Sequence, residues 1–191
     1  SRSTGVALLA LTHGGKGWAV KQGMLKALGG FRFLCDADLS MPIEHLAGFL
    51  PPVLTDFDIA VASREVSGAH RYGEPWQRHL MGRGFNWLVR LTAVPRLRDT
   101  QCGFKCFSQE TAEKLFPQQR LHGFGFDVEI LFLALKMGMR VVEVPIPWYY
   151  RRESKVRPLL DTSAMLRDLA AIRWNHLRKR YSLAKGPVKS I

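Results

Sequence analysis

Long apolar runs and patterned cysteines are both missing from this 191-residue sequence. No stretch reaches the roughly eighteen apolar residues that a membrane-spanning helix needs. The three cysteines are odd in number and match no disulfide or zinc spacing, which argues against a disulfide framework and favours a reducing compartment. Acidic residues are also scarce, with 16 against 28 lysines and arginines, so the net charge is +12. Such an excess predicts an anionic partner: phosphate groups, a membrane surface or a nucleic acid.

The remaining composition is that of one globular domain. Hydrophobic residues make up 47% of the sequence and charged residues 23%, and the length suits a single core. The excess charge is concentrated at one end, because residues 151–191 contain eleven basic and three acidic residues and so contribute +8 of the +12. We therefore divide the sequence into a domain over 1–150 and a basic amphipathic segment over 151–191 that packs on the domain or on a membrane surface.

Strand and helix patterns alternate through the first half of the sequence. Short apolar runs bounded by turn residues predict strands at 6–11, 31–35, 56–64 and 139–150. Helical spacing predicts helices from the GGKG loop to Gly29, from Pro42 to Leu50, and over 77–94, 126–138 and 162–181, with another that runs through Lys114. Alternation of this kind indicates an α/β fold with a parallel sheet. In the last strand, Pro145 and Pro147 indicate a sheet edge.

Asp36 and Asp38 follow an apolar strand, at the end where ligands gather in parallel α/β sheets. If the strand continues, the two side chains point the same way, and a divalent cation could offset their repulsion. Mg²⁺ commonly binds through one or two carboxylates plus substrate phosphates. Two other interpretations stay open, an ordinary turn and the nucleophile and acid of a DxD phosphohydrolase. The phosphohydrolase is the weaker one, because no second acidic pair follows a later strand.

Several cationic segments could contact an anion. GGKG at 14–17 leads into a helix whose backbone donors suit an anion, with Lys16 as a point charge, although it lacks the P-loop spacing. Arg64 follows a strand and Arg78 lies in a helix, and two arginines that converge on a cleft can neutralise phosphates. The segment 151–157 could hold a phosphate or lie against lipid. An ordinary solvated surface explains each of these segments at least as well, and it is the more common explanation for a lone arginine.

Two polar segments in apolar surroundings are further candidates. RDTQCGFK at 98–105 places a carboxylate, an amide, a glycine and a lysine within a few residues, which is typical of a shaped functional loop and also of a surface turn. FDVE puts Asp127 and Glu129 at the start of an apolar helix, where acids ordinarily interact with the helix dipole.

Taken in order, these segments resemble the polyprenyl-phosphate glycosyltransferases of glycosyltransferase family 2. The similarity is closest to the dolichyl-phosphate β-glucosyltransferases and more distant to the dolichyl-phosphate mannose synthases. It covers nearly the whole chain, and RDTQCGFK together with FDVE is its most specific part. The segments that carry it are GKGWAVKQGM, DADLS, ASR, the spacing of Arg78, Gly82 and Asn86, RDTQCGFKCF, FDVEIL, and VPIPW followed by SKVRP.

The resemblance implies a GT-A (Rossmann-like) α/β fold with a mixed, mostly parallel sheet, in which 1–150 is the catalytic domain. It also implies that this sequence starts after the family's first β/α unit. The implied reaction is the metal-dependent, inverting transfer of a hexose, glucose being the first choice, from a UDP- or GDP-hexose to a polyprenyl or dolichyl phosphate.

The resemblance also implies roles for individual residues. Asp36 and Asp38 would hold Mg²⁺ or Mn²⁺ on the donor diphosphate. The implied catalytic residues are Asp99, Asp127 and Glu129. The implied substrate-binding residues are Lys16, Arg64, Arg78, Gln101, Lys105, Ser154 and Lys155.

The expected location is peripheral, on the cytoplasmic face of an anionic membrane and in contact with it through 151–191, with no nucleic-acid partner. The alternative from a different class is a non-enzymatic basic module that binds an anionic membrane or a nucleic acid through the same segment. Trp148, Tyr149 and Tyr150 precede the basic run and keep this alternative open, because bases stack on aromatic side chains.

Overall fold

A mixed four-stranded sheet forms the centre of the molecule. The computed structural model describes residues 5–38, 40–150 and 158–183, without the side chains at positions 77, 78, 81, 85 and 158–162. The strands lie in the order β1 (Phe31–Cys35), β4 (Phe104–Ser108), β2 (Ile59–Ser63) and β5 (Val141–Pro145). β4 is antiparallel to both β1 and β2, whereas β2 and β5 are parallel. Three of the four strands therefore run in one direction, which is the mixed, mostly parallel sheet that the resemblance implies.

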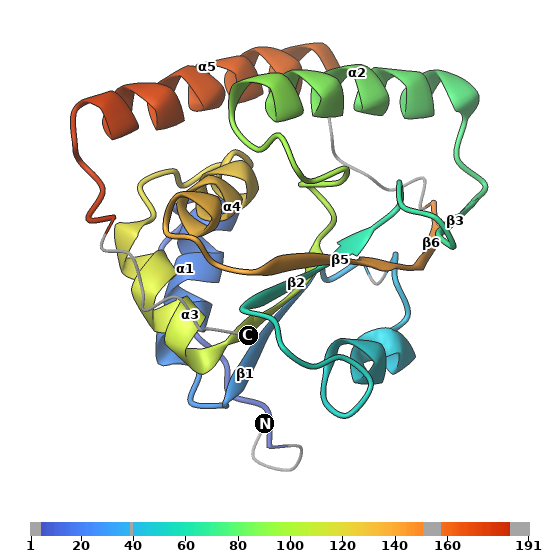
Figure 1. Ribbon diagram of the computed structural model, residues 1–191, viewed down its shortest axis with the longest axis horizontal. Coiled ribbons are helices and arrows are strands. Elements are labelled where there is room, and N and C mark those ends of the chain that lie inside the picture. Colours follow the sequence, from blue (N-terminus) through green and yellow to red (C-terminus); the bar gives the residue numbers. More distant parts are fainter. Residues whose placement is uncertain (1–4, 39, 151–157, 184–191) are drawn as a thin grey trace.

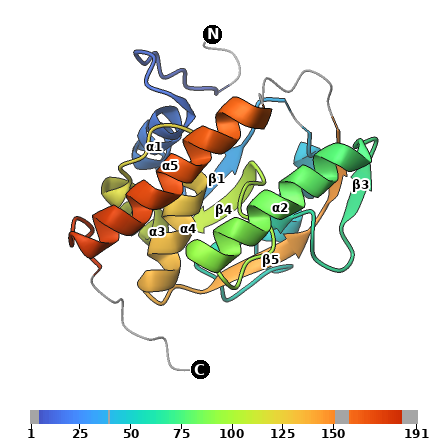
Figure 2. The same ribbon diagram turned by 90° about the horizontal axis from the view of Figure 1, so that it is seen from above.

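Helices cover one face of this sheet and form a further layer beyond it (Figure 1). The helices next to the sheet are α1 (Lys16–Lys26), α3 (Gln109–Leu115) and α4 (Phe126–Lys136). The outer layer consists of α2 (Trp76–Thr92) and α5 (Pro158–Leu177), which lie side by side (Figures 1 and 2). The remaining elements are the 3₁₀ helices η1 (Ile43–Phe49) and η2 (Phe116–Gln118) and a small parallel sheet of β3 (His70–Tyr72) and β6 (Pro147–Tyr149).

Alternation along the strands produces two apolar clusters, one on each face of the sheet. Leu34 and Ile59 point toward the helices and pack in the larger cluster with the apolar residues of α4. Phe33 and Phe104 point to the opposite face, where their rings pack against Phe49 of η1. Because both faces are covered, the central strand β2 (IAVAS) is almost entirely apolar in the sequence.

Most of the expected elements are present, with their ends shifted by a few residues. β1 and β2 correspond to the strands expected at 31–35 and 56–64, and α1, α2, α4 and α5 correspond to expected helices. The helix after Pro42 is the 3₁₀ helix η1. β5 lies at the edge of the sheet, as Pro145 and Pro147 indicated.

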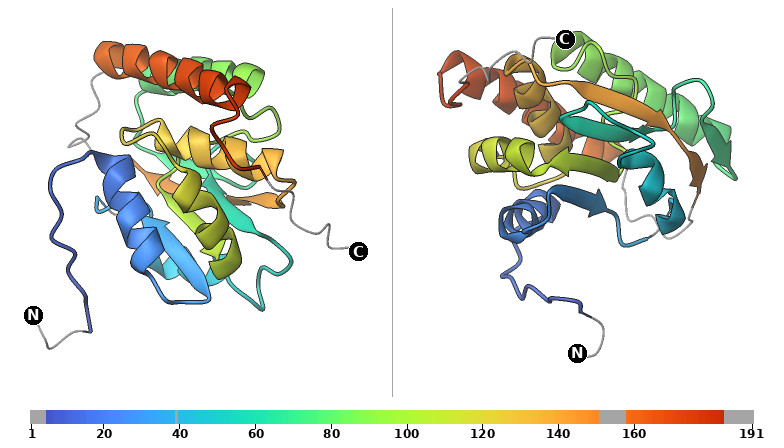
Figure 3. Two further views of the ribbon diagram at one scale, coloured as in Figure 1. Left: turned by 90° about the vertical axis from the view of Figure 1, so that its left-hand side faces the viewer. Right: turned by 60° about the horizontal axis from the view of Figure 1, so that its bottom comes forward.

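The strand expected at 6–11 is absent. These residues have no regular structure and extend away from the body of the molecule (Figure 3), with Val6 71% and Leu8 91% exposed. A strand is stable only when its backbone groups pair with a neighbour, and no described strand pairs with this segment. The apolar pattern alone therefore gave a wrong prediction here.

Three features were not predicted from the sequence. The segment 98–105 is expected to be a shaped loop or a surface turn, but its last two residues begin β4, the strand between β1 and β2. Lys105 interrupts the apolar run of β4, and in the structure it is buried with Asp127. The strand expected at 139–150 is split at Ile146 into β5 and β6, which belong to different sheets. The loop expected before Trp76 contains β3.

The structure also describes the cysteines and the longest apolar helices. All three cysteines are free, which fits the absence of a disulfide pattern. Among the described residues, no helix combines the length and the apolar character needed to cross a bilayer.

Candidate active site

Lys16 and Asp36 join the GGKG segment to the end of β1. The Nζ atom of Lys16 lies 2.9 Å from Oδ1 and 3.1 Å from Oδ2 of Asp36. The same nitrogen lies 5.8 and 5.9 Å from the ring centroids of Phe124 and Phe126. Burial alone would lower the pKa of Lys16, but the carboxylates around it, including that of Asp127, together raise it. Lys16 therefore remains a cation at neutral pH, next to two acids from distant segments.

The glycines of GGKG allow this approach. Gly15 has φ of 93°, and a β-carbon there would overlap the carbonyl of His122. A β-carbon on Gly17 would press on the carbonyl of Leu121. The backbone N–H of Trp18 donates to the His122 carbonyl at 3.2 Å, so this donor is used within the protein. The glycines thus bring the start of α1 against the loop before α4 and fix the position of Lys16.

Asp36 is held in place by the segment that leads into β4. The backbone N–H of Asp36 donates to the carbonyl of Gly103 at 2.9 Å. A β-carbon at position 103 would overlap the Asp36 carboxylate, so a larger residue there would push the carboxylate out of its present position. Asp38 is exposed, and its Oδ1 accepts a hydrogen bond from the backbone N–H of Ser40 at 3.0 Å. Asp38 therefore shapes the turn while its carboxylate stays accessible from solvent.

Lys105 and Asp127 form a buried ion pair behind Lys16. The Nζ atom of Lys105 lies 2.6 Å from Oδ1 of Asp127 and donates to the carbonyl of Cys102, also at 2.6 Å. Lys105 is 1% exposed, which leaves no surface for the substrate contact that the resemblance implies. Its structural role is to compensate Asp127 and to tie β4 to the start of α4. Lys16, Asp36, Lys105 and Asp127 thus form one cluster of alternating charge.

Glu129 lies outside this cluster. Residues two apart on a helix point in different directions, and Glu129 is fully buried on another side of α4. Its carboxylate accepts hydrogen bonds from the backbone N–H groups of Arg120 (3.0 Å) and Leu121 (2.8 Å) and from the Tyr181 hydroxyl (2.7 Å). Burial raises the pKa of Glu129, and these hydrogen bonds oppose the shift. The structure therefore places Glu129 as a support of the loop before α4, away from Asp36.

Arg64 and Asp99 form a second polar group at the end of β2. The guanidinium binds the carboxylate in a bidentate manner, with Nε 2.6 Å from Oδ2 and Nη2 2.9 Å from Oδ1. Asp99 is fully buried, which alone would raise its pKa, but the charge and hydrogen bonds of Arg64 lower the pKa of Asp99 to about 2. The backbone N–H groups of Arg98 and Asp99 donate to Glu143 of β5, each at 2.9 Å. Asp99 is therefore an ionised residue that positions Arg64.

Arg64 is held from its other side by an aromatic ring. Its guanidinium carbon lies 5.3 Å from the ring centroid of Trp148 in β6, and its side chain is 20% exposed. The backbone N–H of Gln101 donates to Asp99 at 3.2 Å, and the Gln101 amide contacts the sulfur of Met165 at 3.7 Å. The structure thus brings together Arg64, Asp99 and Gln101, three of the residues for which the resemblance implies roles.

The other predicted residues cannot be placed in the same way. Arg78 lies in α2, but its side chain is outside the described part of the structure, and Ser154 and Lys155 lie outside the described residues. Neither Glu143 nor Trp148 is expected at this site from the sequence, which indicates Trp148 only as a ring on which a nucleic-acid base could stack. The signal for Glu143 was a charge inside the apolar run VVEV, and Trp148 belongs to the VPIPW segment that contributed to the resemblance.

Comparison with known proteins identifies relatives over most of the chain. The family model described as Glycosyl transferase family 2 matches residues 2–116. A dolichyl-phosphate beta-glucosyltransferase from Dictyostelium discoideum is 32% identical over 182 residues, which cover 92% of this chain and 56% of that protein. The protein of the same name from Drosophila melanogaster is 37% identical over 173 residues, 83% of this chain and 51% of that protein. The chain thus spans about half the length of the curated relatives it matches.

Solved structures share the fold. Glucosyl-3-phosphoglycerate synthase from Mycobacterium tuberculosis, in complex with Mn²⁺, UDP-glucose and glycerol 3-phosphate, aligns with a TM-score of 0.59 at 20% identity. The alignment covers 90% of this chain and 57% of that chain. The UDP complex of the same enzyme aligns with a TM-score of 0.56 at 19% identity, over 90% of this chain and 56% of that one. These similarities confirm the expected GT-A fold.

Proposed function

This chain belongs to glycosyltransferase family 2, and from that premise we propose that it transfers glucose from a nucleotide sugar to a polyprenyl or dolichyl phosphate. The reaction depends on a divalent metal, inverts the anomeric centre and takes place at the cytoplasmic face of a membrane. The observation that carries the proposal is the convergence of Lys16, Asp36 and Asp127, which come from three separate segments of the sequence.

The names of the relatives support the substrates. The curated relatives are named for dolichyl phosphate and for β-glucosyl transfer, and a solved structure with the same fold contains UDP-glucose and Mn²⁺. These names favour UDP-glucose over a GDP-hexose as donor. Family membership also makes the DxD phosphohydrolase the weaker interpretation of Asp36 and Asp38.

The residues present fit a hard divalent cation. Asp36 and Asp38 offer carboxylate oxygens at the end of β1, and Gly103 leaves space for the Asp36 carboxylate. Within the described residues, no group of three or more His, Cys, Asp or Glu side chains could hold a metal alone. Mg²⁺ and Mn²⁺ would therefore take further ligands from water and the donor diphosphate, as Mg²⁺ commonly does. When bound, such an ion would stabilise negative charge on the leaving diphosphate.

The chain's own residues supply positioning and positive charge. Lys16, fixed by Asp36 and kept charged by the surrounding carboxylates, can contact a donor phosphate oxygen. The ion pair of Lys105 and Asp127 holds the start of α4 against β4. The Asp127 carboxylate is thereby kept near Lys16. Arg64 is oriented by Asp99 and Trp148, and it presents its exposed edge as a second site for a phosphate.

The acceptor makes a strong general base unnecessary. A phosphate monoester is already an anion, so one of its oxygens can attack the anomeric carbon directly. The new bond joins that oxygen to the anomeric carbon while the bond to the donor's β-phosphate oxygen breaks. The nucleoside diphosphate leaves with the bonding electron pair, and no proton has to move. A single displacement of this kind inverts the anomeric centre.

A donor panel tests the proposal. The purified protein is incubated with a polyprenyl phosphate, Mn²⁺ or Mg²⁺, and UDP-glucose, GDP-mannose or another UDP-sugar, and lipid-linked sugar is measured with and without EDTA. We expect transfer from UDP-glucose, loss of transfer with EDTA, and a β-linked product by NMR. Asp36→Asn should abolish transfer, and Asp56→Asn, at an exposed acid paired with Arg140, should not. The proposal fails if no donor is consumed with any lipid phosphate.

A further inference from the structure

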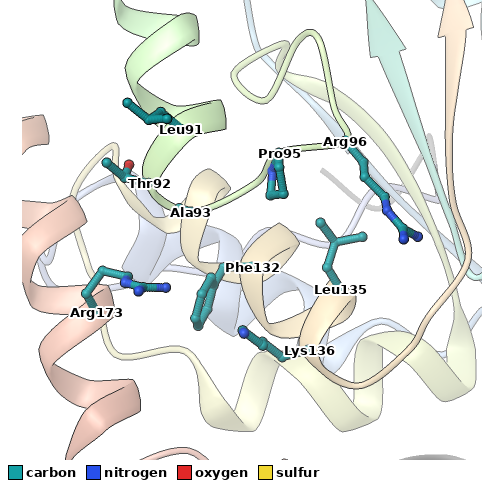
Figure 4. Close-up of a pocket in the computed structure, with 9 residues that line it drawn as sticks. All are labelled: Leu91, Thr92, Ala93, Pro95, Arg96, Phe132, Leu135, Lys136 and Arg173. Atoms are coloured by element: carbon teal, nitrogen blue, oxygen red, sulfur yellow. The ribbon is translucent and has the colours of Figure 1, made fainter.

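A second hollow lies at the opposite end of α4 from Asp127. It has a volume of about 380 Å³ and lies between the C-terminal ends of α2 and α4 and the side of α5 (Figure 4). Asp127 is in the first turn of α4 and Lys136 in its last, so the two are roughly 14 Å apart along the helix axis. None of the lining residues belongs to the cluster around Asp36.

The lining of this pocket is cationic and apolar. Arg96, Lys136 and Arg173 line it together with apolar residues, and no acidic side chain from the described part of the chain does. Figure 4 shows Lys136 and Arg173 pointing toward the ring of Phe132 from α4 and α5, and Arg96 lies at the other end. The Nζ atom of Lys136 is 5.6 Å from the centroid of that ring. None of the three cations forms a salt bridge with a described acidic side chain.

Helix dipoles do not account for all of this charge. α2 and α4 both end beside the pocket, and each helix C-terminus carries about half a negative charge. Two such ends offset about one of the three positive charges, so a positive potential remains. This potential also acts on the nearby ring of His176. Burial lowers the pKa of that histidine, and the positive charges of Lys136 and Arg173 lower it further. The pocket is therefore suited to an anion.

An exposed apolar stripe runs along α2 to this pocket. Trp76, Leu80, Trp87 and Leu91 are each between 63% and 71% exposed. Successive residues of a helix are about 100° apart, so these four lie within a sector of about 60°. Leu91 both ends the stripe and lines the pocket.

Basic residues and a second helix extend this surface. Arg83 and Arg90 of α2 are exposed, and both lie next to the stripe along one of its sides. α5 lies beside α2 (Figure 2) and exposes Leu166, Trp174 and Leu177. Tryptophan and leucine bordered by arginine are typical of helices that lie in the interface of an anionic bilayer.

We propose that this pocket binds the phosphate group of an anionic phospholipid while the α2 stripe lies in the bilayer interface. Lys136 and Arg173 contact the phosphate, and the partly exposed side chains of Leu91 and Leu135 contact the apolar part of the lipid. A free phosphate would make no use of the apolar wall or of the stripe that continues from it. The inference does not rest on the transferase reaction, because it concerns a different surface and can be measured without any sugar donor.

Vesicle sedimentation tests the proposal on the 191-residue protein. Vesicles of phosphatidylcholine alone are compared with vesicles that also contain phosphatidylglycerol, and the Lys136→Gln, Arg173→Gln double variant is compared with wild type. Each surface cation contributes to binding, so loss of these two should weaken binding to the anionic vesicles by about 30-fold. The matched control, Lys26→Gln with Lys114→Gln, removes the same charge from α1 and α3 and should change binding by less than about threefold, because screening limits its reach.

Two further arms separate the lipid from other anions. Trp87→Gln should weaken binding to both kinds of vesicle, whereas Leu28→Gln, at a leucine that is 92% exposed outside α2 and α5, should not. Inorganic phosphate and a single-stranded oligonucleotide serve as competitors and should not displace the protein from anionic vesicles at physiological salt.

The proposal is overturned if both vesicle types bind equally, if the double variant and its control behave alike, or if phosphate or oligonucleotide displaces the lipid. Circular dichroism verifies that each variant is folded before its binding is compared.

Discussion

Gly103 lies so close to Asp36 that any β-carbon at position 103 would occupy the space of the Asp36 carboxylate. The backbone of the two residues is also joined by a hydrogen bond of 2.9 Å. The position of the proposed metal ligand is thus set from the start of β4, 67 positions further along the sequence.

Gly103→Ala should reduce transfer by at least about tenfold by moving the Asp36 carboxylate, because a misplaced catalytic group is costly even when the fold survives. Mn²⁺-dependent binding of UDP-glucose, followed by calorimetry, should weaken in parallel. Gly23→Ala in α1 is the control, because a β-carbon there meets nothing within 4 Å. If both variants bind the donor as wild type does, Gly103 does not position Asp36.

Asp127→Asn should destabilise the fold by about 3–5 kcal/mol, because Lys105 would be left as an unpaired buried charge. Urea denaturation measures this loss. Lys114→Gln breaks an exposed pair with Glu110 and should cost no more than about 0.5 kcal/mol. The double variant Lys105→Met, Asp127→Leu should recover much of the stability and remain inactive. Recovered activity in that variant would contradict a role for Asp127 at the site.

Asp99 should make stability depend on acid pH. Its pKa is lowered to about 2 in the folded protein from 3.8, so its contribution is fully present above about pH 4 and is lost as the pH falls toward 2. A shift of this size corresponds to about 2–3 kcal/mol. Wild type should therefore lose more of its free energy of unfolding between pH 4 and pH 2 than Asp99→Asn does, as measured by urea titrations. Equal losses would show that Arg64 does not hold Asp99 ionised.

Tyr181→Phe should show whether Glu129 supports the fold or takes part in catalysis. Removal of the hydroxyl takes one hydrogen bond from a buried carboxylate and should cost about 1–3 kcal/mol of stability. The rate of transfer by the folded protein should not change, because Glu129 faces away from Asp36. Tyr72→Phe, at an exposed tyrosine, is the control for thermal stability. A rate reduced by the hundredfold or more typical of a lost acid or base would return Glu129 to the reacting centre.

The sequence predicted an element correctly where its apolar pattern and its turn or helix-ending residues indicated the same structure. Apolar runs bounded by turns located β1 and β2, and helical spacing located α1, α2, α4 and α5. The resemblance brought together Lys16, Asp36, Asp127, Arg64, Asp99 and Gln101, which the structure places in two adjoining polar groups.

The sequence failed where a long-range contact changes the meaning of a residue. Lys105 interrupts the apolar run of β4 as a surface lysine would, and only its partner Asp127 makes it a buried residue. The opposite roles of Asp127 and Glu129 depend on which side of α4 faces which loop, and a motif of four letters does not contain that information. The run at 6–11 has the composition of a strand but no partner among the described strands.

The strand order β1-β4-β2-β5 has a consequence for how the chain acquires its structure. No two strands that are consecutive in the sequence are neighbours in this sheet, so none of its pairings can begin as a simple hairpin. Non-local pairing slows folding because loops must close before contacts form. During synthesis, the backbone edges of the apolar strands β1 and β2 remain unpaired until β4 has emerged from the ribosome. We expect refolding to be slow and the early chain to depend on chaperones to avoid aggregation.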